Sequence, residues 1–129
     1  MGKFEFAESS IRRLKQVDHN LSAVMYEAKE RSIIDFDISC GYRPVEEQNI
    51  LFHEGKSQLD GVRNKSKHNY NPARAVDIYA YNGKYADYDK DKMYYLSQVI
   101  KDAAEDLGVR ITWGGDWKSF IDMPHYELS

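Results

Sequence analysis

The sequence "ARAVDIYAY" at residues 73–81 alternates in character and is rich in β-branched and aromatic residues, which predicts a β-strand. The Asn82-Gly83 pair that follows is typical of a tight hairpin turn. Within the strand, Asp77 stands between Val76 and Ile78, so its carboxylate should point to the opposite face from these two side chains. If that face encloses a site, the charge requires a partner, and a metal ion is one such partner.

Outward from this strand, the periodicity of the sequence predicts further helices and strands. Apolar residues at helical spacing indicate one helix from Ser9 to Arg31, with Ser9 or Ser10 at its N-cap. The other predicted elements are a strand at 32–39, a short helix at 44–55, a helix at 89–107, and strands at 109–113 and 125–128. Helices and strands do not alternate regularly, which predicts an α+β fold. We expect a small, mostly antiparallel sheet flanked by helices, in a single domain spanning residues 1–129.

Composition excludes several classes of function. Lys and Arg are dispersed in a chain of net charge −3, which argues against a nucleic-acid partner. The apolar runs are too short for membrane insertion, and the N-terminal residues lack the apolar segment of a secretory signal. We therefore expect synthesis in the cytoplasm, and a monomer. The single cysteine, Cys40, ends an apolar strand pattern, so a buried inert thiol is favoured over a nucleophile.

Three side chains near predicted strands form a candidate metal site. His68 precedes the central strand, Asp77 lies within it, and His125 opens the last strand after Pro124. Two imidazoles and a carboxylate are a ligand set of catalytic zinc, with the fourth position left open. The alternative is three unrelated surface residues.

Two acidic residues near His125 strengthen the metal interpretation. Asp122 is placed to act as a general base, although it is also a common turn residue. Glu127 shares a strand face with His125 and can hold its other ring nitrogen, or else it is a solvated strand end.

The segments "GYRP" (41–44), "SKH" (66–68), "AVD" (75–77), "WGGDW" (113–117) and "DMPHYEL" (122–128) occur in an order that resembles one peptidase family. This is the zinc D-alanyl-D-alanine carboxypeptidase family, which includes phage endolysins that cut the L-alanyl–D-glutamate bond of peptidoglycan. The resemblance implies that His68, Asp77 and His125 bind Zn²⁺ and that Asp122 is the catalytic base. It also implies that Arg43 stabilises the oxyanion and that Ser66 orients the substrate or the site.

The sequence departs from the family pattern in two places. The spacing from His68 to Asp77 is two residues longer, and the glycine of the pattern is missing, so the shape of loop 69–74 is left open. The acid at Asp122 is a glutamate in the carboxypeptidases and dipeptidases, and in this respect the chain resembles the phage endopeptidases more closely.

Two residues of "WGGDW" have alternative interpretations. Asp116 either accepts a hydrogen bond from a ligand histidine or turns the loop, and Trp117 either walls a substrate groove or packs in the core.

The leading functional prediction is a zinc-dependent L-alanyl–D-glutamate endopeptidase that acts as a phage endolysin on the peptidoglycan stem peptide, at the cell wall after release from the cytoplasm. One alternative is a D-alanyl-D-alanine carboxypeptidase or dipeptidase. The other is a non-enzymatic zinc-fold module that binds the cell wall or builds a phage particle.

Overall fold

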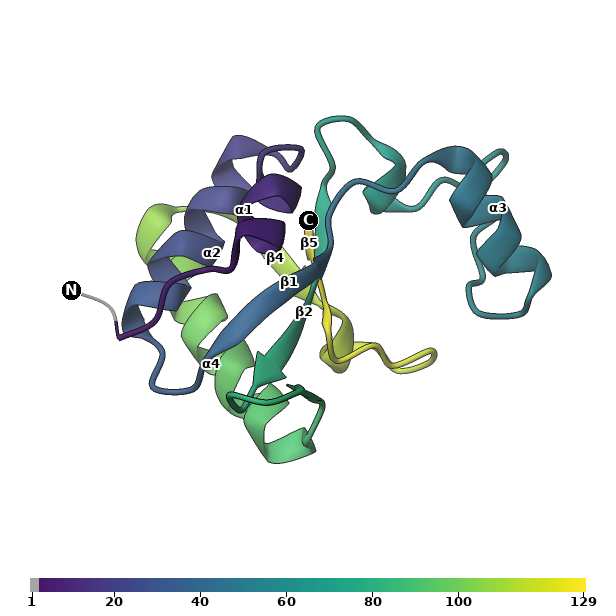
Figure 1. Cartoon of the computed structure of the whole chain (residues 1–129). Coiled ribbons are helices and arrows are strands. Elements are labelled where there is room, and N and C mark those ends of the chain that lie inside the picture. The colour runs from purple at the N-terminus through teal and green to yellow at the C-terminus, as the bar shows by residue number, and fades with distance from the viewer. Residues whose placement is uncertain (1–2) are drawn as a thin grey trace.

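The computed structural model describes residues 3–129 (Figure 1). Its helices are α1 (Glu8–Leu14), α2 (His19–Arg31), α3 (Val45–His53) and α4 (Lys90–Leu107), with short 3-10 helices η1 (Lys67–Asn69) and η2 (Gly114–Asp116). Its strands are β1 (Phe36–Cys40), β2 (Ala75–Tyr81), β3 (Ala86–Asp87), β4 (Ile111–Trp113) and β5 (His125–Leu128). Within the described residues, no helix combines the length and apolar character that crossing a membrane requires.

The strands form one antiparallel sheet in the order β1-β2-β5-β4, with β3 hairpinned onto β2. The prediction of an α+β fold with an antiparallel sheet is confirmed. Strand β2 is central, and its register with β5 places Asp77 directly opposite His125. Residues so paired have Cβ atoms about 5 Å apart, so the sheet itself brings these two side chains together.

The alternation of β2 separates core from site. Val76 and Ile78 are fully buried in the hydrophobic core, together with Tyr126 of β5. Helices α1, α2 and α4 lie together on one side of the sheet, whereas α3 projects away from them (Figure 1). Asp77 points to the face opposite the core, as the alternation predicts.

The prediction of one helix from Ser9 to Arg31 is wrong, because the chain breaks between α1 and α2. Val17 forms a parallel bridge with Ala73, and Asp18 caps α2 by accepting a hydrogen bond from the backbone N–H of Asn20 (2.9 Å). The predicted serine cap is also wrong: Ala7 is the N-cap of α1, and Ser10 Oγ instead donates to Asp37 Oδ1 at 2.6 Å.

This break positions the segment that enters β2. The Ala73 N–H donates to the Gln16 carbonyl at 2.8 Å, and the Ala73 carbonyl accepts from the Asp18 N–H at 2.8 Å. The longer loop between His68 and Asp77 is therefore held against the α1–α2 junction, a tertiary contact that local periodicity does not reveal.

Candidate metal centre

Three elements bring His68, Asp77 and His125 to one point. Asp77 and His125 are cross-strand partners on β2 and β5. His68 lies on η1, whose start is capped by Ser66: the Ser66 side chain accepts from the His68 N–H at 3.2 Å. Both histidines are buried, so their ring positions are fixed by packing as well as by hydrogen bonds.

The three side chains converge through one atom each. His68 Nε2 lies 3.3 Å from Asp77 Oδ1 and 3.3 Å from His125 Nδ1, and the last two atoms are 3.1 Å apart. Ligands of tetrahedral zinc at bond lengths of 2.0–2.1 Å are separated by roughly 3.3 Å, so these atoms form one face of such a tetrahedron. The residues present therefore fit a metal ion with an open fourth position.

The other nitrogen of each ring is already occupied. His68 Nδ1 lies 2.7 Å from the Gly41 carbonyl, and His125 Nε2 lies 2.7 Å from Glu127 Oε1. Because both partners are acceptors, each of these nitrogens carries a proton and donates it. Once they are deprotonated, the nitrogens that face each other can offer lone pairs to a metal.

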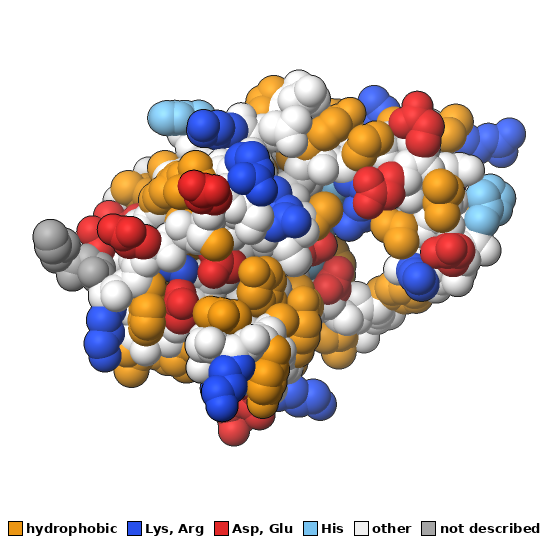
Figure 2. Space-filling view, in the orientation of Figure 1, with side chains coloured by type: hydrophobic (Ala, Val, Ile, Leu, Met, Phe, Trp, Pro, Cys, Tyr) orange, Lys and Arg blue, Asp and Glu red, His pale blue; other side chains and the backbone are white. Residues whose placement is uncertain are grey.

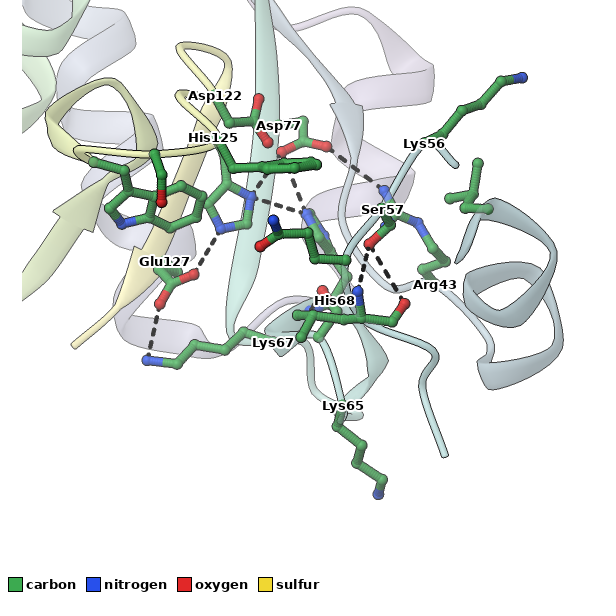
Figure 3. A pocket seen from close by; sticks show the side chains of 17 residues that line it. Arg43, Lys56, Ser57, Lys65, Lys67, His68, Asp77, Asp122, His125 and Glu127 are labelled. Atoms are coloured by element: carbon green, nitrogen blue, oxygen red, sulfur yellow. Dashed lines mark hydrogen bonds and ion pairs between the residues drawn. The ribbon is translucent and has the colours of Figure 1, made fainter. Parts of the chain in front are cut away.

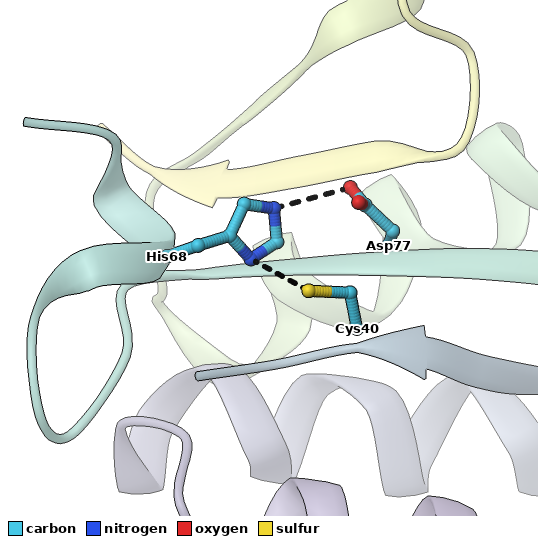
Figure 4. A group of neighbouring side chains, drawn as sticks. All are labelled: Cys40, His68 and Asp77. Carbon is cyan, nitrogen blue, oxygen red and sulfur yellow. Dashed lines mark hydrogen bonds and ion pairs between the residues drawn. The ribbon is translucent and has the colours of Figure 1, made fainter. Parts of the chain in front are cut away.

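Cys40 lies beside His68, at the ring nitrogen that does not face Asp77 (Figure 4). Its Sγ is 3.7 Å from Nδ1, the nitrogen that already contacts the Gly41 carbonyl at the shorter distance. A bulge in β1 between Ile38 and Cys40 pairs Cys40 with Asp77 and leaves the thiol partly exposed. The expectation of a buried thiol is wrong, since that bulge is set by strand pairing and not by the apolar pattern.

Without metal, hydrogen bonds among the three groups shift the pKa of each one. Burial opposes a charge on His68, but hydrogen bonds to Asp77 and Cys40 outweigh it and raise its pKa to about 10. Burial likewise opposes the charge on Asp77, yet hydrogen bonds from His125 and His68 hold its pKa far below the usual value. The pKa of His125 is also raised, because its contacts with Asp77 and Glu127 outweigh its burial.

Zinc binding should therefore release protons and tighten with rising pH. At pH 7 the metal must displace the proton of His68, so the apparent affinity should rise about tenfold per pH unit for each proton displaced. In the metal-free protein, the raised His68 pKa makes the folded state less stable as the pH rises, which is the opposite direction from the change in zinc affinity. Its stabilising contact is fully present below about pH 6.5 and is lost as the pH rises through about 10. Calorimetric titration with zinc in buffers of different ionisation enthalpy measures the released protons, and an affinity independent of pH between 6 and 8 would contradict this expectation.

Asp122 and Arg43 lie beside the three converging atoms. An oxygen of Asp122 is within 4.8 Å of ligand atoms of Asp77 and His125, and the His125 N–H donates to the Asp122 carbonyl at 3.1 Å. Burial and the nearby charge of Asp77 raise the pKa of Asp122. Arg43 Nη2 is 3.7 Å from Asp77 Oδ2, and the Arg43 N–H donates to the His68 carbonyl at 2.8 Å.

The sequence matches a known protein family over almost its whole length. The family model of the phage L-alanyl-D-glutamate peptidases matches residues 1–128. The chain belongs to this family. The predicted resemblance is confirmed, and the chain is an enzyme of the peptidase class, which decides against the non-enzymatic alternative.

Two relatives are also named as L-alanyl–D-glutamate endopeptidases. The peptidase is 30% identical over 123 residues to the peptidoglycan L-alanyl-D-glutamate endopeptidase CwlK of Bacillus subtilis, a match that covers 87% of this chain and 71% of that protein. It also resembles the crystal structure of the Serratia marcescens L-Ala D-Glu endopeptidase ChiX, with a TM-score of 0.83 and 26% identity. That structural match covers 98% of the peptidase and 92% of the other chain.

The candidate metal centre of the peptidase opens into a pocket of about 590 Å³ (Figure 3). In the space-filling view, the molecule is hollowed between its main body and the part that projects with α3 (Figure 2). The pocket lining includes Arg43, Lys56, Ser57, Leu59, Lys65, Ser66, Lys67, Trp117, Phe120 and Asp122, besides the three candidate ligands.

The structure distinguishes between the alternatives for "WGGDW". The Trp117 ring lies 5.2 Å from the His125 ring and lines the pocket, which favours the groove wall over the core. Asp116 does not join the site. Its carboxylate pairs with Lys101 Nζ of α4 at 2.7 Å, because η2 turns it outward, and its suggested bond to a ligand histidine is not formed.

The backbone of Gly114 packs directly against the backbone of Asp122. Its carbonyl accepts from the Asp122 N–H at 3.0 Å, and a Cβ at this position would lie 2.3 Å from the Asp122 carbonyl oxygen. Gly114→Ala must therefore displace the loop, and we expect a loss of about 1–3 kcal/mol in the free energy of unfolding, with reduced activity. Urea denaturation measures the loss. Lys118→Ala, an exposed position of the same loop outside the pocket lining, should leave both quantities unchanged, and an equally stable Gly114→Ala would contradict the packing argument.

Several contacts of this site have no signal in the sequence. The Gly41 carbonyl fixes the His68 ring, and Lys67 Nζ contacts Glu127 Oε2 at 3.2 Å behind His125. Gln48 of α3 contacts Arg43. The segment "GYRPVEEQ" (41–48) contains Gln48, but neither spacing nor periodicity indicates its partner.

Proposed function

We propose that the protein is a zinc-dependent endopeptidase that cuts the L-alanyl–D-glutamate bond of peptidoglycan, with residues 1–129 as a single catalytic domain. One observation carries the proposal. The chain belongs to the phage L-alanyl-D-glutamate peptidases. Its His68 Nε2, Asp77 Oδ1 and His125 Nδ1 lie 3.1–3.3 Å apart, and all three residues line an open pocket. The similarity to CwlK and ChiX, both named as L-alanyl–D-glutamate endopeptidases, supports the same bond.

His68, Asp77 and His125 would hold the ion. When bound, zinc supplies Lewis acidity, which lowers the pKa of a water molecule toward about 7 and polarises a carbonyl. Glu127, held by Lys67, would keep the His125 ring in the required orientation, and the Gly41 carbonyl would do the same for His68.

Asp122 is proposed as the group that moves the proton. Its carboxylate accepts a proton from the attacking water and later donates it to the leaving amine. A pKa raised by burial suits both steps, because it brings the group closer to the working pH.

Arg43 is proposed to stabilise the negative charge that develops on the carbonyl oxygen. Its guanidinium lines the pocket, and its Nη2 is near Asp77 Oδ2. Donors that are already fixed before the reaction stabilise such a charge most effectively.

The proposed substrate is the stem peptide of peptidoglycan, at the cell wall, cleaved by a monomer. Trp117 and Phe120 provide apolar surface in the pocket, and Lys56 and Lys65 bring positive charge to it. This combination fits a peptide that carries carboxylates beside small apolar side chains.

Digestion of purified peptidoglycan, with zinc and with a chelator, tests the proposed activity. Mass spectrometry of the products should show new N-terminal glutamate that disappears on chelation. Release of D-alanine would instead support the carboxypeptidase alternative with the same residues, and no cleavage by the zinc-loaded protein would refute the proposal.

A role as a phage endolysin is proposed from the family description alone. Added to Gram-negative cells with a permeabilised outer membrane, the protein should lower the turbidity of the suspension. An enzyme that cuts purified peptidoglycan but leaves such cells intact would contradict the lytic role and retain the peptidase activity.

A further inference from the structure

Gln48 is a buried polar residue on a largely exposed helix. It is fully buried, and it is the one residue of α3 with this burial, whereas Glu47 and Ile50 beside it are exposed. A buried amide is costly unless its hydrogen bonds are made, so its partners indicate what it does.

All of the main hydrogen-bonding groups of Gln48 are used. Its Oε1 accepts from Arg43 Nη1 at 2.7 Å, and its Nε2 donates to Ser57 Oγ and to the Leu59 carbonyl, both at 2.8 Å. The guanidinium can only donate and the Leu59 carbonyl can only accept, so the orientation of the amide is determined by its neighbours.

The loop that receives this amide is itself well defined. Asp60 Oδ1 accepts from the backbone N–H groups of Val62, Arg63 and Asn64 at 2.9–3.0 Å. Gly61 has a φ of +84°, and a Cβ there would lie 3.1 Å from Gln48 Cβ. Gln48 therefore connects Arg43 to a fixed segment of the pocket wall.

We infer that Gln48 is a positioning residue that holds the Arg43 guanidinium in the orientation needed to reach the substrate carbonyl. This inference rests on the role proposed above for Arg43. With Nη1 bound to Gln48 and Nη2 directed toward Cys40 Sγ (3.4 Å) and Asp77, the arginine loses the rotational freedom of a long side chain. An oxyanion donor displaced by about 1 Å can cost about 100-fold in rate, so this restraint matters for kcat.

Gln48→Met tests the inference, because it keeps the volume and removes the hydrogen bonds. We expect kcat to fall about 10–100-fold, with KM changed less than about threefold and zinc content unchanged. In an Arg43→Ala background the same substitution should have almost no further effect on kcat, since the residue through which it acts is gone. Losses that multiply in the double variant would overturn the inference.

Asn49→Ala is the matched control. Asn49 Nδ2 donates to the Asp60 carbonyl at 3.1 Å, so it joins the same helix to the same loop without touching Arg43. It should retain kcat within about threefold of the parent. An equal loss of kcat in Asn49→Ala and Gln48→Met would show that the loop, and not the arginine, matters, and would overturn the inference.

Gln48→Glu decides the matter if Gln48→Met does not fold. The glutamate retains an acceptor for Arg43 Nη1 but loses the donors toward the loop, so it should keep more activity than Arg43→Ala, which has no guanidinium to position. Equal activities of the two would refute the positioning role.

NMR of the Arg43 guanidinium gives a readout other than turnover: rotation about the Cζ–Nε bond should be slow in the parent and fast in Gln48→Met. If the parent protein cuts no peptidoglycan, the proposed function fails, whereas an active parent with a freely rotating Arg43 overturns this inference alone.

Discussion

Replacement of Asp122 by asparagine is expected to lower kcat by about 10²–10⁴-fold and to leave zinc content unchanged. The amide has nearly the same size as the carboxylate but cannot accept the proton of the attacking water. Because the three converging ligand atoms belong to other residues and the Asp122 loop is held by Gly114, the substitution should not disturb the metal site. Steady-state cleavage of stem peptide, with metal analysis of the same sample, measures both quantities.

Asp116→Asn is the matched control for this substitution. It makes the same chemical change in the same loop, but at a carboxylate that pairs with Lys101 outside the pocket. Its activity should equal that of the parent. Turnover of Asp122→Asn within tenfold of the parent would remove Asp122 from the role of base.

The second large effect is expected for His68→Ala, which removes one of the three proposed ligands. Loss of a group that merely orients a ligand lowers metal affinity about 10–100-fold, so loss of the ligand itself should exceed that range. Activity should disappear at zinc concentrations that saturate the parent. Titration against a chromogenic chelator measures the affinity.

His53→Ala is the control for the loss of an imidazole. His53 is an exposed residue at the end of α3, and zinc affinity should be unchanged without it. Unchanged zinc affinity in His68→Ala would mean that the ion is held elsewhere, and the proposed site would have to be abandoned.

The site residues near the central strand were predictable because their signals are local. Alternation around Asp77 indicates which face it occupies, and Pro124 marks the start of the strand that His125 opens. Helix α4 was also predictable, since it combines a regular apolar pattern with an Asp89 cap and a left-handed Gly108 at its end.

The features that were missed depend on contacts between distant segments. The break between α1 and α2 is fixed by the pairing of Val17 with Ala73, and periodicity continues across it. The place of Cys40 depends on a bulge, and a shift of one residue in strand register changes which side chain faces the site. Asp116 shows the reverse error, because a residue inside a motif can be turned away from the site by a single helical turn.

The pairing of β2 with β5 also determines when the proposed metal site becomes complete. His68 and His125 meet across 57 positions of the chain, and Asp77 and His125 across 48. Contacts of such long sequence separation form late, after much chain entropy has been lost. During synthesis on the ribosome, the emerging chain has no complete ligand set until His125 has left the exit tunnel and β5 has joined the sheet. Loading of the proposed metal site is therefore expected to follow tertiary assembly, because a nascent or partly folded chain lacks the complete set of proposed ligands.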